Sequence, residues 1–391
     1  MAQFDHLSAL LESFTEKGKG PAGCACMVAK DGEVVYEGYF GQADREKGVD
    51  VGPDTVFRLY SMTKVIVCTA AMILFERGKF LLNEPLHLYL PEFKDTKKIV
   101  TDPNGQVHTE PTQNPILIRH AFGMMTGHPY PFGDSLPARE IARLQEELRE
   151  QSGGRYTLRD EIRAIASAPL MFEPGTRWLY GYGHDLVAGL IEAVSGKSVG
   201  EFLQEEIFGP LGMKDTGYRF RGDIQERMAV MYERAEDGTL TPSSGDFDRV
   251  HREDSLLEPG GMGLYSTTRD YLKFASMLAA GGTSDGVRII GRHTIDLMRT
   301  NHLSEEQMND FTYSYSAGYG YGLGVRTLID RAAGGSNSPL GEFGWTGMAG
   351  TWTSISPETN TAVVYMHQML PNMEEYHHLR VRAAAYGALQ P

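Results

Sequence analysis

A long apolar helix with a serine and a lysine at its first turn constrains the fold of this chain more than any other feature. The run from Val65 to Phe75 is apolar nearly all round, and a helix of that kind is buried within a core rather than laid on a surface. Ser61 and Lys64 stand three residues apart at its first turn, where they share one face of the helix. Lys64 is therefore placed to remove the proton that makes Ser61 nucleophilic.

The serine and the lysine also have an ordinary structural interpretation, because serine is a favoured N-cap and the bare spacing S-x-x-K arises by chance. Two observations favour catalysis instead. No other lysine of the chain follows a serine by three residues, and a lysine at the mouth of a buried helix loses hydration, which favours its neutral form. The positive potential at a helix N-terminus also favours negative charge that develops at Ser61.

Length and charge narrow the class of protein. A chain of 391 residues is longer than one ordinary core, so we expect two lobes. The 37 basic and 51 acidic side chains give a formal net charge of −14, and no dense basic run offsets it. Nucleic acid and anionic membranes are therefore not expected as partners.

The sequence also argues against membrane insertion and secretion. No stretch reaches the roughly 18 apolar residues that a membrane span requires, and the first twelve residues have the apolar spacing of an amphipathic helix rather than of a signal peptide. The three cysteines, Cys24, Cys26 and Cys68, are an odd number that argues against a disulfide framework, and no further ligands stand near the C-x-C pair for a metal site. We therefore expect a cytoplasmic protein.

The two ends of the chain carry strand patterns. Gly23–Ala29 and Glu33–Gly41 flank an Asp31-Gly32 turn, which predicts a β-hairpin. Near the other end, strands are predicted over Tyr319–Leu328, Met348–Ser356 and Thr361–Gln368, with a closing helix over Tyr376–Leu389. We expect an α/β fold of the α+β type: residues 1–85 and 257–391 form an antiparallel sheet flanked by the terminal helices, and residues 86–256 form a helix-rich lobe.

Two segments of the predicted helix-rich lobe each allow a functional and a structural interpretation. The charged helical pattern over Asp134–Gln151 suits either a lid, around residues 129–155, or a plain solvated surface helix. Gly196-Lys197-Ser198-Val199-Gly200 satisfies G-x-S-x-G, but a nucleophile elbow must follow a strand, whereas a helical pattern over 186–195 precedes it. Ser198 is therefore expected to cap the helix that begins near Val199 rather than to act as a nucleophile.

Two aromatic, glycine-spaced segments are candidates for the rest of a site. Trp178-Leu179-Tyr180-Gly181-Tyr182 can present a phenol to a site, although core packing explains such aromatics equally well. Gly341–Trp352 contains glycines within an apparent strand, which mark close approach of the backbone to another group. A strand edge beside the Ser61 helix would offer backbone N–H groups to a substrate carbonyl; the alternative is a glycine-rich entry to a core strand.

Taken together, these segments resemble the class C β-lactamase-like serine hydrolases, which include the D-alanyl-D-alanine peptidases, and most of all the branch called family VIII carboxylesterases. The resemblance covers nearly the whole chain, and the matching segments stand in the order of the family: Ser61-Met62-Thr63-Lys64, Leu117–His120 to Thr126-Gly127, Trp178-Leu179-Tyr180 to Ile191–Gly196, Pro210–Met213, Gly260–Ser266 and Trp345-Thr346-Gly347.

The resemblance implies roles for particular residues. Ser61 would be the nucleophile, Lys64 its base and Tyr180 the partner that shares the proton, so that Lys64 and Tyr180 act as one coupled unit. The backbone N–H groups of Ser61 and Met348 would form the oxyanion hole. The substrate-binding positions that it implies are Trp345, Thr346, Gly347 and Tyr182.

Two departures from the family pattern bear on the substrate. β-Lactamases of this class carry Tyr-x-Asn and Lys-Thr-Gly, where this chain has Tyr180-Gly181-Tyr182 and Trp345-Thr346-Gly347. A phenol replaces the amide and an indole replaces the ammonium that would attract a carboxylate. We therefore expect hydrolysis of small carboxylic esters without a metal or organic cofactor. The alternatives are acyl transfer on the same site, a β-lactamase or D-alanyl-D-alanine peptidase, and a non-catalytic scaffold.

Overall fold

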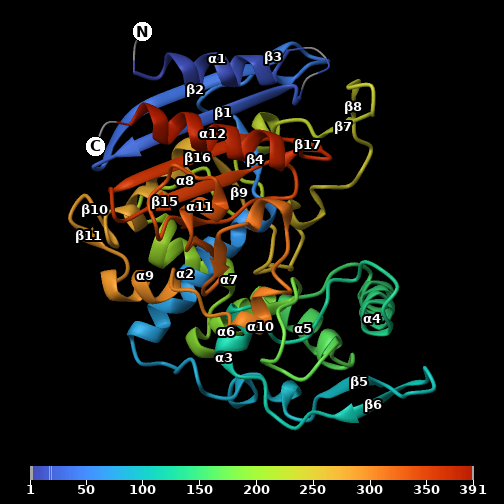
Figure 1. The fold of residues 1–391 in the computed structure, drawn as a ribbon. Helices are drawn as coiled ribbons and strands as arrows, with labels where there is room; N and C mark the ends of the chain where they lie inside the picture. Colours follow the sequence, from blue (N-terminus) through green and yellow to red (C-terminus); the bar gives the residue numbers. More distant parts are fainter. Residues whose placement is uncertain (1–2, 17, 19, 390–391) are drawn as a thin grey trace.

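The chain is built around one antiparallel sheet (Figure 1). The computed structural model describes residues 3–16, 18 and 20–389, and within them the sheet has eight strands in the order β12-β13-β14-β15-β16-β1-β2-β3. Its strands are β1 Gly23–Lys30, β2 Glu33–Asp44, β3 Val49–Asp50, β12 Tyr319–Tyr321, β13 Arg326–Leu328, β14 Phe343–Gly344, β15 Trp352–Ser356 and β16 Thr361–His367. Strand β1 from one end of the chain thus pairs with β16 from the other.

Helices cover both faces of this sheet. The helices are α1 Asp5–Phe14, α2 Thr63–Glu76, α3 Ile118–Phe122, α4 Leu136–Ser152, α5 Leu158–Ala166, α6 Gly183–Ser195, α7 Val199–Leu203, α8 Thr268–Ala279, α9 Arg292–Met298, α10 Glu305–Met308, α11 Arg331–Gly334 and α12 Glu374–Ala388. The terminal helices α1 and α12 pack against each other on one face of the sheet, α1 against β1 and β2 and α12 against β16 (Figure 1). Cys24 and Cys26 alternate toward them, whereas Ala25 and Met27 point into the larger core that holds α2 and α8.

The middle of the chain is rich in helix. Helices α3 to α6 lie away from the large sheet in Figure 1, beside a hairpin of β5 Lys97–Thr101 and β6 Val107–Pro111. Helix α4 forms where the charged pattern predicts a helix, and Ser135 caps its start by accepting the N–H of Ala138 at 3.2 Å. The boundaries of the two lobes and the role of 129–155 as a lid stay predictions.

Short strand pairs complete the fold. They are β4 Val56–Arg58 with β9 Tyr265–Thr267, β10 Thr283–Ser284 with β11 Val287–Arg288, and β17 Met369–Leu370 with β7 Tyr232–Arg234 and β8 Leu240–Pro242. Across the described ranges, no helix combines the length and the hydropathy needed to cross a bilayer.

The expected fold class is confirmed, but two predicted strands are wrong in their bounds. Tyr319–Leu328 is a hairpin of β12 and β13, because Gly322–Gly324 reverses the chain and Gly324 adopts φ +88°. Met348 lies in a turn, closed by the hydrogen bond from Gly350 N–H to Gly347 O at 3.0 Å, and β15 begins only at Trp352. The predicted terminal helices are confirmed over Asp5–Phe14 and Glu374–Ala388; positions 1 and 2 of the first prediction lie outside the described residues.

Candidate active site

The candidate nucleophile stands at the junction between β4 and α2. Tyr60–Met62 forms a 3₁₀ turn that runs directly into α2, and every residue of α2 from Thr63 to Leu74 is buried. Tyr60 has φ +45°, a left-handed conformation that costs free energy in a residue other than glycine. The apolar sequence of α2 produces a buried helix, and the 3₁₀ turn that precedes it holds Ser61 at the wall of a cavity.

Lys64 reaches Ser61 and has two further partners. Its Nζ lies 3.1 Å from Ser61 Oγ, 3.0 Å from the Tyr130 hydroxyl and 2.6 Å from the Gly261 carbonyl oxygen. The lysine is fully buried. A neutral amine has two N–H donors and one lone pair, so it can donate to Tyr130 and Gly261 while its lone pair accepts the proton of Ser61. The three contacts thus match a general base.

Two tyrosines lie beside Lys64, and they face it differently. The Tyr130 hydroxyl accepts a hydrogen bond from Nζ, whereas Tyr180 presents its ring, with Nζ 4.7 Å from the ring centroid. The Tyr180 hydroxyl accepts a 3.2 Å hydrogen bond from Trp345 Nε1 instead. Burial, and then the charge of Asp185, raise the pKa of Tyr130 well above its usual value. The sequence argument missed Tyr130, because 66 residues separate it from Lys64.

A buried carboxylate, that of Asp185, reaches Lys64 through the backbone of Gly261. Asp185, in the first turn of α6, accepts the N–H of Gly261 at 3.0 Å through Oδ1, and the carbonyl of that same residue accepts from Lys64. The second oxygen, Oδ2, is buried and has no hydrogen-bond partner among the described residues. Burial raises the pKa of the Asp185 carboxyl, while the charge of Lys64 lowers it. Sequence reasoning also missed Asp185, since nothing in its local pattern distinguishes it from a helix N-terminal aspartate.

The glycine-rich segment lies beside the nucleophile, as expected from its composition. Gly347 packs so closely that an added Cβ would lie 2.1 Å from Thr351 Oγ1 and 2.3 Å from the Leu59 carbonyl oxygen. Thr351 Oγ1 in turn donates to that Leu59 oxygen at 2.9 Å. The N–H of Met348 makes no backbone hydrogen bond within the part of the chain that the structure describes. This N–H is available as an oxyanion donor next to Ser61.

The remaining predicted binding positions line the same cavity. Trp345 is buried and stacks on Tyr180 with ring centroids 5.7 Å apart. Thr346 donates through Oγ1 to Glu374 Oε2 at 2.8 Å. The Tyr182 hydroxyl accepts from Gln145 Nε2 at 2.6 Å and therefore reaches toward α4 rather than toward Lys64.

This cavity has a volume of about 590 Å³, its exposed lining is mainly apolar, and eight of its lining residues are aromatic. Ser61 and the predicted positions Tyr180, Tyr182 and Trp345 to Met348 all line it, and its other aromatic lining residues are Tyr60, Tyr130, Phe132, Tyr313 and Tyr315. An aromatic wall suits an uncharged acyl or alcohol group. The structure therefore brings together every site residue that the sequence predicts.

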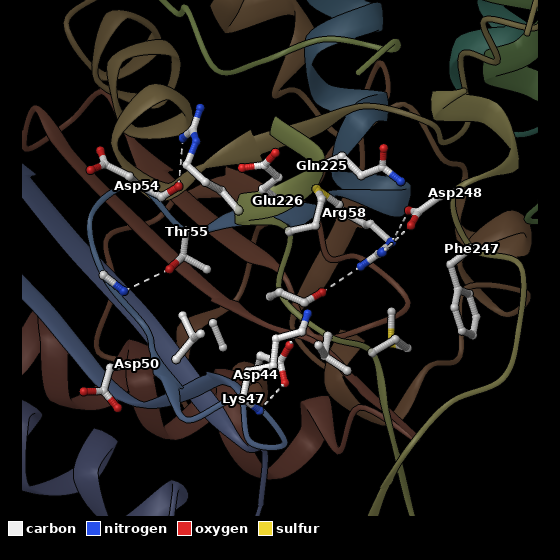
Figure 2. Close-up of a pocket in the computed structure, with 18 of the residues that line it drawn as sticks. Asp44, Lys47, Asp50, Asp54, Thr55, Arg58, Gln225, Glu226, Phe247 and Asp248 are labelled. Carbon is white, nitrogen blue, oxygen red and sulfur yellow. Dashed lines mark hydrogen bonds and ion pairs between the residues drawn. The ribbon is translucent and has the colours of Figure 1, made fainter. Parts of the chain in front are cut away.

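A second cavity of about the same volume lies near β4 and β3, and Figure 2 shows its polar lining. Its charged side chains are largely paired: Arg58 forms two hydrogen bonds with Asp248, and Lys47 lies 3.0 Å from Asp44. It contains neither Ser61 nor Lys64. Ser198 lies in neither cavity, and its Oγ accepts the N–H of Glu201 at 3.2 Å as the N-cap of α7. The prediction that Ser198 is a cap is confirmed.

Comparison with known proteins agrees with this geometry. The β-lactamase family model matches residues 7–388. Protein Rv1367c of Mycobacterium tuberculosis (strain ATCC 25618 / H37Rv) is 31% identical over 376 residues, which cover 95% of this chain and 90% of that protein. Esterase EstB of Burkholderia gladioli is 30% identical over 278 residues, which cover 66% of each. The solved structure of EstCE1, a hydrolase with promiscuous acyltransferase activity, shares the fold with a TM-score of 0.79 and 23% identity over 98% of each chain. The chain therefore belongs to the β-lactamase family, whose members near it include hydrolases and acyltransferases.

Proposed function

We propose that this protein hydrolyses carboxylic esters through an acyl-enzyme on Ser61, with Lys64 as the general base. The observation that carries the proposal is the 3.1 Å contact between buried Lys64 Nζ and Ser61 Oγ at the wall of an aromatic cavity. Ser61 Oγ attacks the ester carbonyl as its proton passes to Lys64. The N–H groups of Ser61 and Met348 stabilise the oxyanion, and the alcohol leaves with the proton. A water molecule then hydrolyses the acyl-enzyme by the same route.

The proton path includes a tyrosine, and two are available. The family resemblance assigns this role to Tyr180, whereas the hydrogen bond from Lys64 supports Tyr130. A phenol with a raised pKa stays neutral near pH 7, so Tyr130 can pass a proton from Lys64 to the leaving oxygen without carrying a charge of its own. We therefore include Tyr130 in the proposed catalytic set, together with Tyr180.

The lining of the cavity favours esters over β-lactams. Trp345 supplies an indole where β-lactam-recognising relatives place an ammonium, and Glu374 adds a carboxylate to the same cavity. Both features disfavour the carboxylate that β-lactams carry. The name of esterase EstB, a relative of 30% identity, supports the same substrate class.

The experiment is a substrate screen with a matched nucleophile variant. Purified protein is assayed on p-nitrophenyl esters of graded chain length and on a chromogenic cephalosporin, and Ser61→Ala is compared with Ser198→Ala. We expect ester turnover that far exceeds cephalosporin turnover and that Ser61→Ala alone abolishes. A fluorophosphonate probe should label Ser61. Labelling of another serine, or a cephalosporin turned over as fast as the best ester, would refute the proposal.

Acyl transfer to an alcohol is the second candidate, and the size of the cavity favours it. About 590 Å³ leaves room for an acceptor alcohol beside a short acyl group, and EstCE1, which shares the fold, is described as having promiscuous acyltransferase activity. Transfer and hydrolysis share the acyl-enzyme and differ only in the nucleophile that resolves it. Product analysis in the presence of a primary alcohol separates them, since transfer yields a new ester in place of free acid.

A further inference from the structure

One side of the catalytic cavity joins a carboxylate to aromatic rings. Glu374, in the first turn of α12, lines the cavity together with Tyr313, Tyr315 and Trp345. Helix α12 packs against the 3₁₀ turn over Ser314–Ser316, which carries Tyr315. A carboxylate among aromatic rings is the combination that binds organic cations, because ring faces and carboxylates both carry negative potential.

The carboxylate is held in place by Thr346 of the segment Trp345-Thr346-Gly347, which we call the third motif. Thr346 Oγ1 donates to Oε2 of Glu374 at 2.8 Å, and His378 Nδ1 lies 3.9 Å from the same oxygen. The side chain keeps 22% of its surface exposed. Burial raises the pKa of this carboxyl, and the hydrogen bond from Thr346 opposes that rise.

The aromatic rings that line the cavity with Glu374 differ in the contacts that their faces already make within the protein. The face of Tyr180 is occupied by Lys64, whose Nζ lies 4.7 Å from the ring centroid. Tyr313 and Tyr315 stack on each other with centroids 5.3 Å apart, and Tyr313 meets Tyr180 edge to face. Tyr313 and Tyr315 are both partly exposed at the cavity. They are therefore the rings that remain for a ligand.

The cationic side chains of the cavity lie on other elements. Arg149 belongs to α4 and pairs with Glu146, and Arg249 belongs to a 3₁₀ turn over Arg249–His251. Helix α4 stands well apart from α12 in Figure 1. Among the described residues that line the cavity, neither α12 nor the third motif contributes a positively charged side chain beside Glu374.

We propose that Glu374, with Tyr313 and Tyr315, binds an alkylammonium group carried by the ester substrate. The inference rests on the proposed esterase function and narrows its substrate class to cationic esters. The ammonium group belongs either to the alcohol, as in a choline ester, or to the acyl group, as in a betaine ester. Both place a cation a few atoms from the carbonyl that Ser61 attacks.

The test compares each cationic ester with its neutral isostere. Acetylcholine is paired with 3,3-dimethylbutyl acetate for the alcohol arm, and the p-nitrophenyl ester of betaine is paired with p-nitrophenyl 3,3-dimethylbutanoate for the acyl arm. The readout is the ratio of kcat/KM, cationic over neutral, in wild type, Glu374→Gln and Glu375→Gln. Glu374→Gln keeps an acceptor for Thr346 and removes the charge. Glu375→Gln removes a charge from the same turn of α12 at an exposed position outside the cavity lining.

We expect Glu374→Gln to lower the ratio about tenfold in one of the two arms, and Glu375→Gln to leave both ratios unchanged. The arm that responds identifies which part of the ester carries the cation. Glu374→Asp should keep most of the preference, since the charge is retained. Ratios that stay equal in wild type and Glu374→Gln in both arms overturn the inference while leaving the esterase proposal intact.

Failure of the esterase proposal has a different signature. If no ester of either kind is turned over, the cation site is still read directly by calorimetric titration of tetramethylammonium into wild type and Glu374→Gln. Binding that is weakened about tenfold in the variant supports the cation site without any reaction. Absence of binding to wild type overturns it.

Discussion

At the scale of single residues, Lys64 Nζ contacts three residues at very different separations along the chain. Ser61 is three residues away, Tyr130 is 66 and Gly261 is 197. All three contacts point at one buried nitrogen, so the loss of any one of them changes which proton Lys64 can accept or donate. The local contact is encoded in a short motif, and the other two depend on the fold.

The first prediction separates the two tyrosines. Tyr130→Phe removes the hydroxyl that Lys64 contacts, whereas Tyr180→Phe keeps the ring beneath Nζ and removes only the partner of Trp345. We expect Tyr130→Phe to lower ester kcat on the order of 10²- to 10³-fold. In a Lys64→Ala background its further effect should vanish, because groups that move one proton act as a unit.

Tyr180→Phe is measured in the same two backgrounds by steady-state kinetics on one p-nitrophenyl ester. A loss that also disappears without Lys64 supports the coupled role that the family resemblance gives to Tyr180. If Tyr130→Phe retains wild-type kcat and Tyr180→Phe does not, Tyr180 alone completes the proton path.

The second prediction concerns Asp185, a positioning residue that reaches Lys64 through the Gly261 peptide. Asp185→Ala leaves the Gly261 N–H without its acceptor, so the Gly261 carbonyl should be held less firmly against Lys64 Nζ. We expect ester kcat to fall on the order of 10-fold with KM little changed. Asp185→Asn, which keeps an oxygen that can accept the Gly261 N–H, should retain most of kcat. Equal losses in the two variants would contradict this positioning role.

The residues that the sequence predicts and those that it misses differ in how many residues of the chain separate them from their contact partners. Ser61 and Lys64 are predictable because helix geometry fixes an i, i+3 pair. Closely spaced glycines indicate that the segment holding Trp345 to Met348 approaches another group, but the roles of Trp345 and Met348 are implied only by the family resemblance. Tyr130, Asp185 and Glu374 act through contacts that only the folded chain creates. Glu374, for example, meets Thr346 across 28 residues and a helix start, and a glutamate in a first helical turn has no distinctive pattern.

At the scale of elements, the segment from Trp345 to Trp352 determines the shape of the site. Thr346 forms an isolated bridge with Trp352, and the Gly347 N–H donates to the Thr351 carbonyl at 2.7 Å. The turn between them exposes the Met348 N–H. Sequence reasoning treated residues 348–356 as one strand, since glycine-spaced apolar residues fit a strand and a tight turn equally. The turn is what frees the N–H groups that a continuous strand would use in pairing.

The third prediction tests this turn. Gly347→Ala places a Cβ within 2.3 Å of two oxygen atoms, so the segment must shift away from Leu59 and from Ser61. We expect kcat to fall on the order of 10²-fold, as for loss of an oxyanion donor. Gly52→Ala is the matched control, because a Cβ there meets no atom within 4 Å. Circular dichroism should show both variants folded, and wild-type kcat in Gly347→Ala would exclude the assigned role of the turn.

At the scale of the whole molecule, a cluster of buried histidines joins the last helix to the large sheet. β16 carries His367, and α12 carries His377 and His378, with the rings of His367 and His377 5.1 Å apart. His378 also touches Thr346 and the Gly350 carbonyl. The terminal helix is therefore attached to the segment from Trp345 to Trp352 through uncharged imidazoles, an arrangement that depends on their staying neutral.

The last prediction follows from this cluster and from similar histidines elsewhere. In the described residues, burial lowers the pKa of seven histidines: His120, His251 and His377 to about 4, His128 and His184 to about 3, and His367 and His378 well below 6.5. The unfolded chain takes up these protons near pH 6.5 and the folded protein does not. Stability is therefore fully present above pH 6.5 and is lost as the pH falls toward 4, by about 1.4 kcal/mol per pH unit for each histidine.

Four carboxyls oppose this loss over part of the range: burial raises the pKa of Glu161 and Glu192 to about 7, and it also raises the pKa of Asp185 and of Glu374. Seven histidines outnumber them, so the free energy of unfolding should fall by several kcal/mol between pH 6.5 and 5.5. Urea denaturation at pH 7.5, 6.5 and 5.5 measures it. His377→Gln should make the free energy of unfolding fall less steeply with pH, by the slope that one bound proton contributes, whatever its effect at pH 7.5. The same substitution at exposed His293 should leave the slope unchanged. A free energy of unfolding that stays constant from pH 7.5 to 5.5 would contradict the prediction, because it would mean that these imidazoles take up protons as easily in the folded protein as in the unfolded chain.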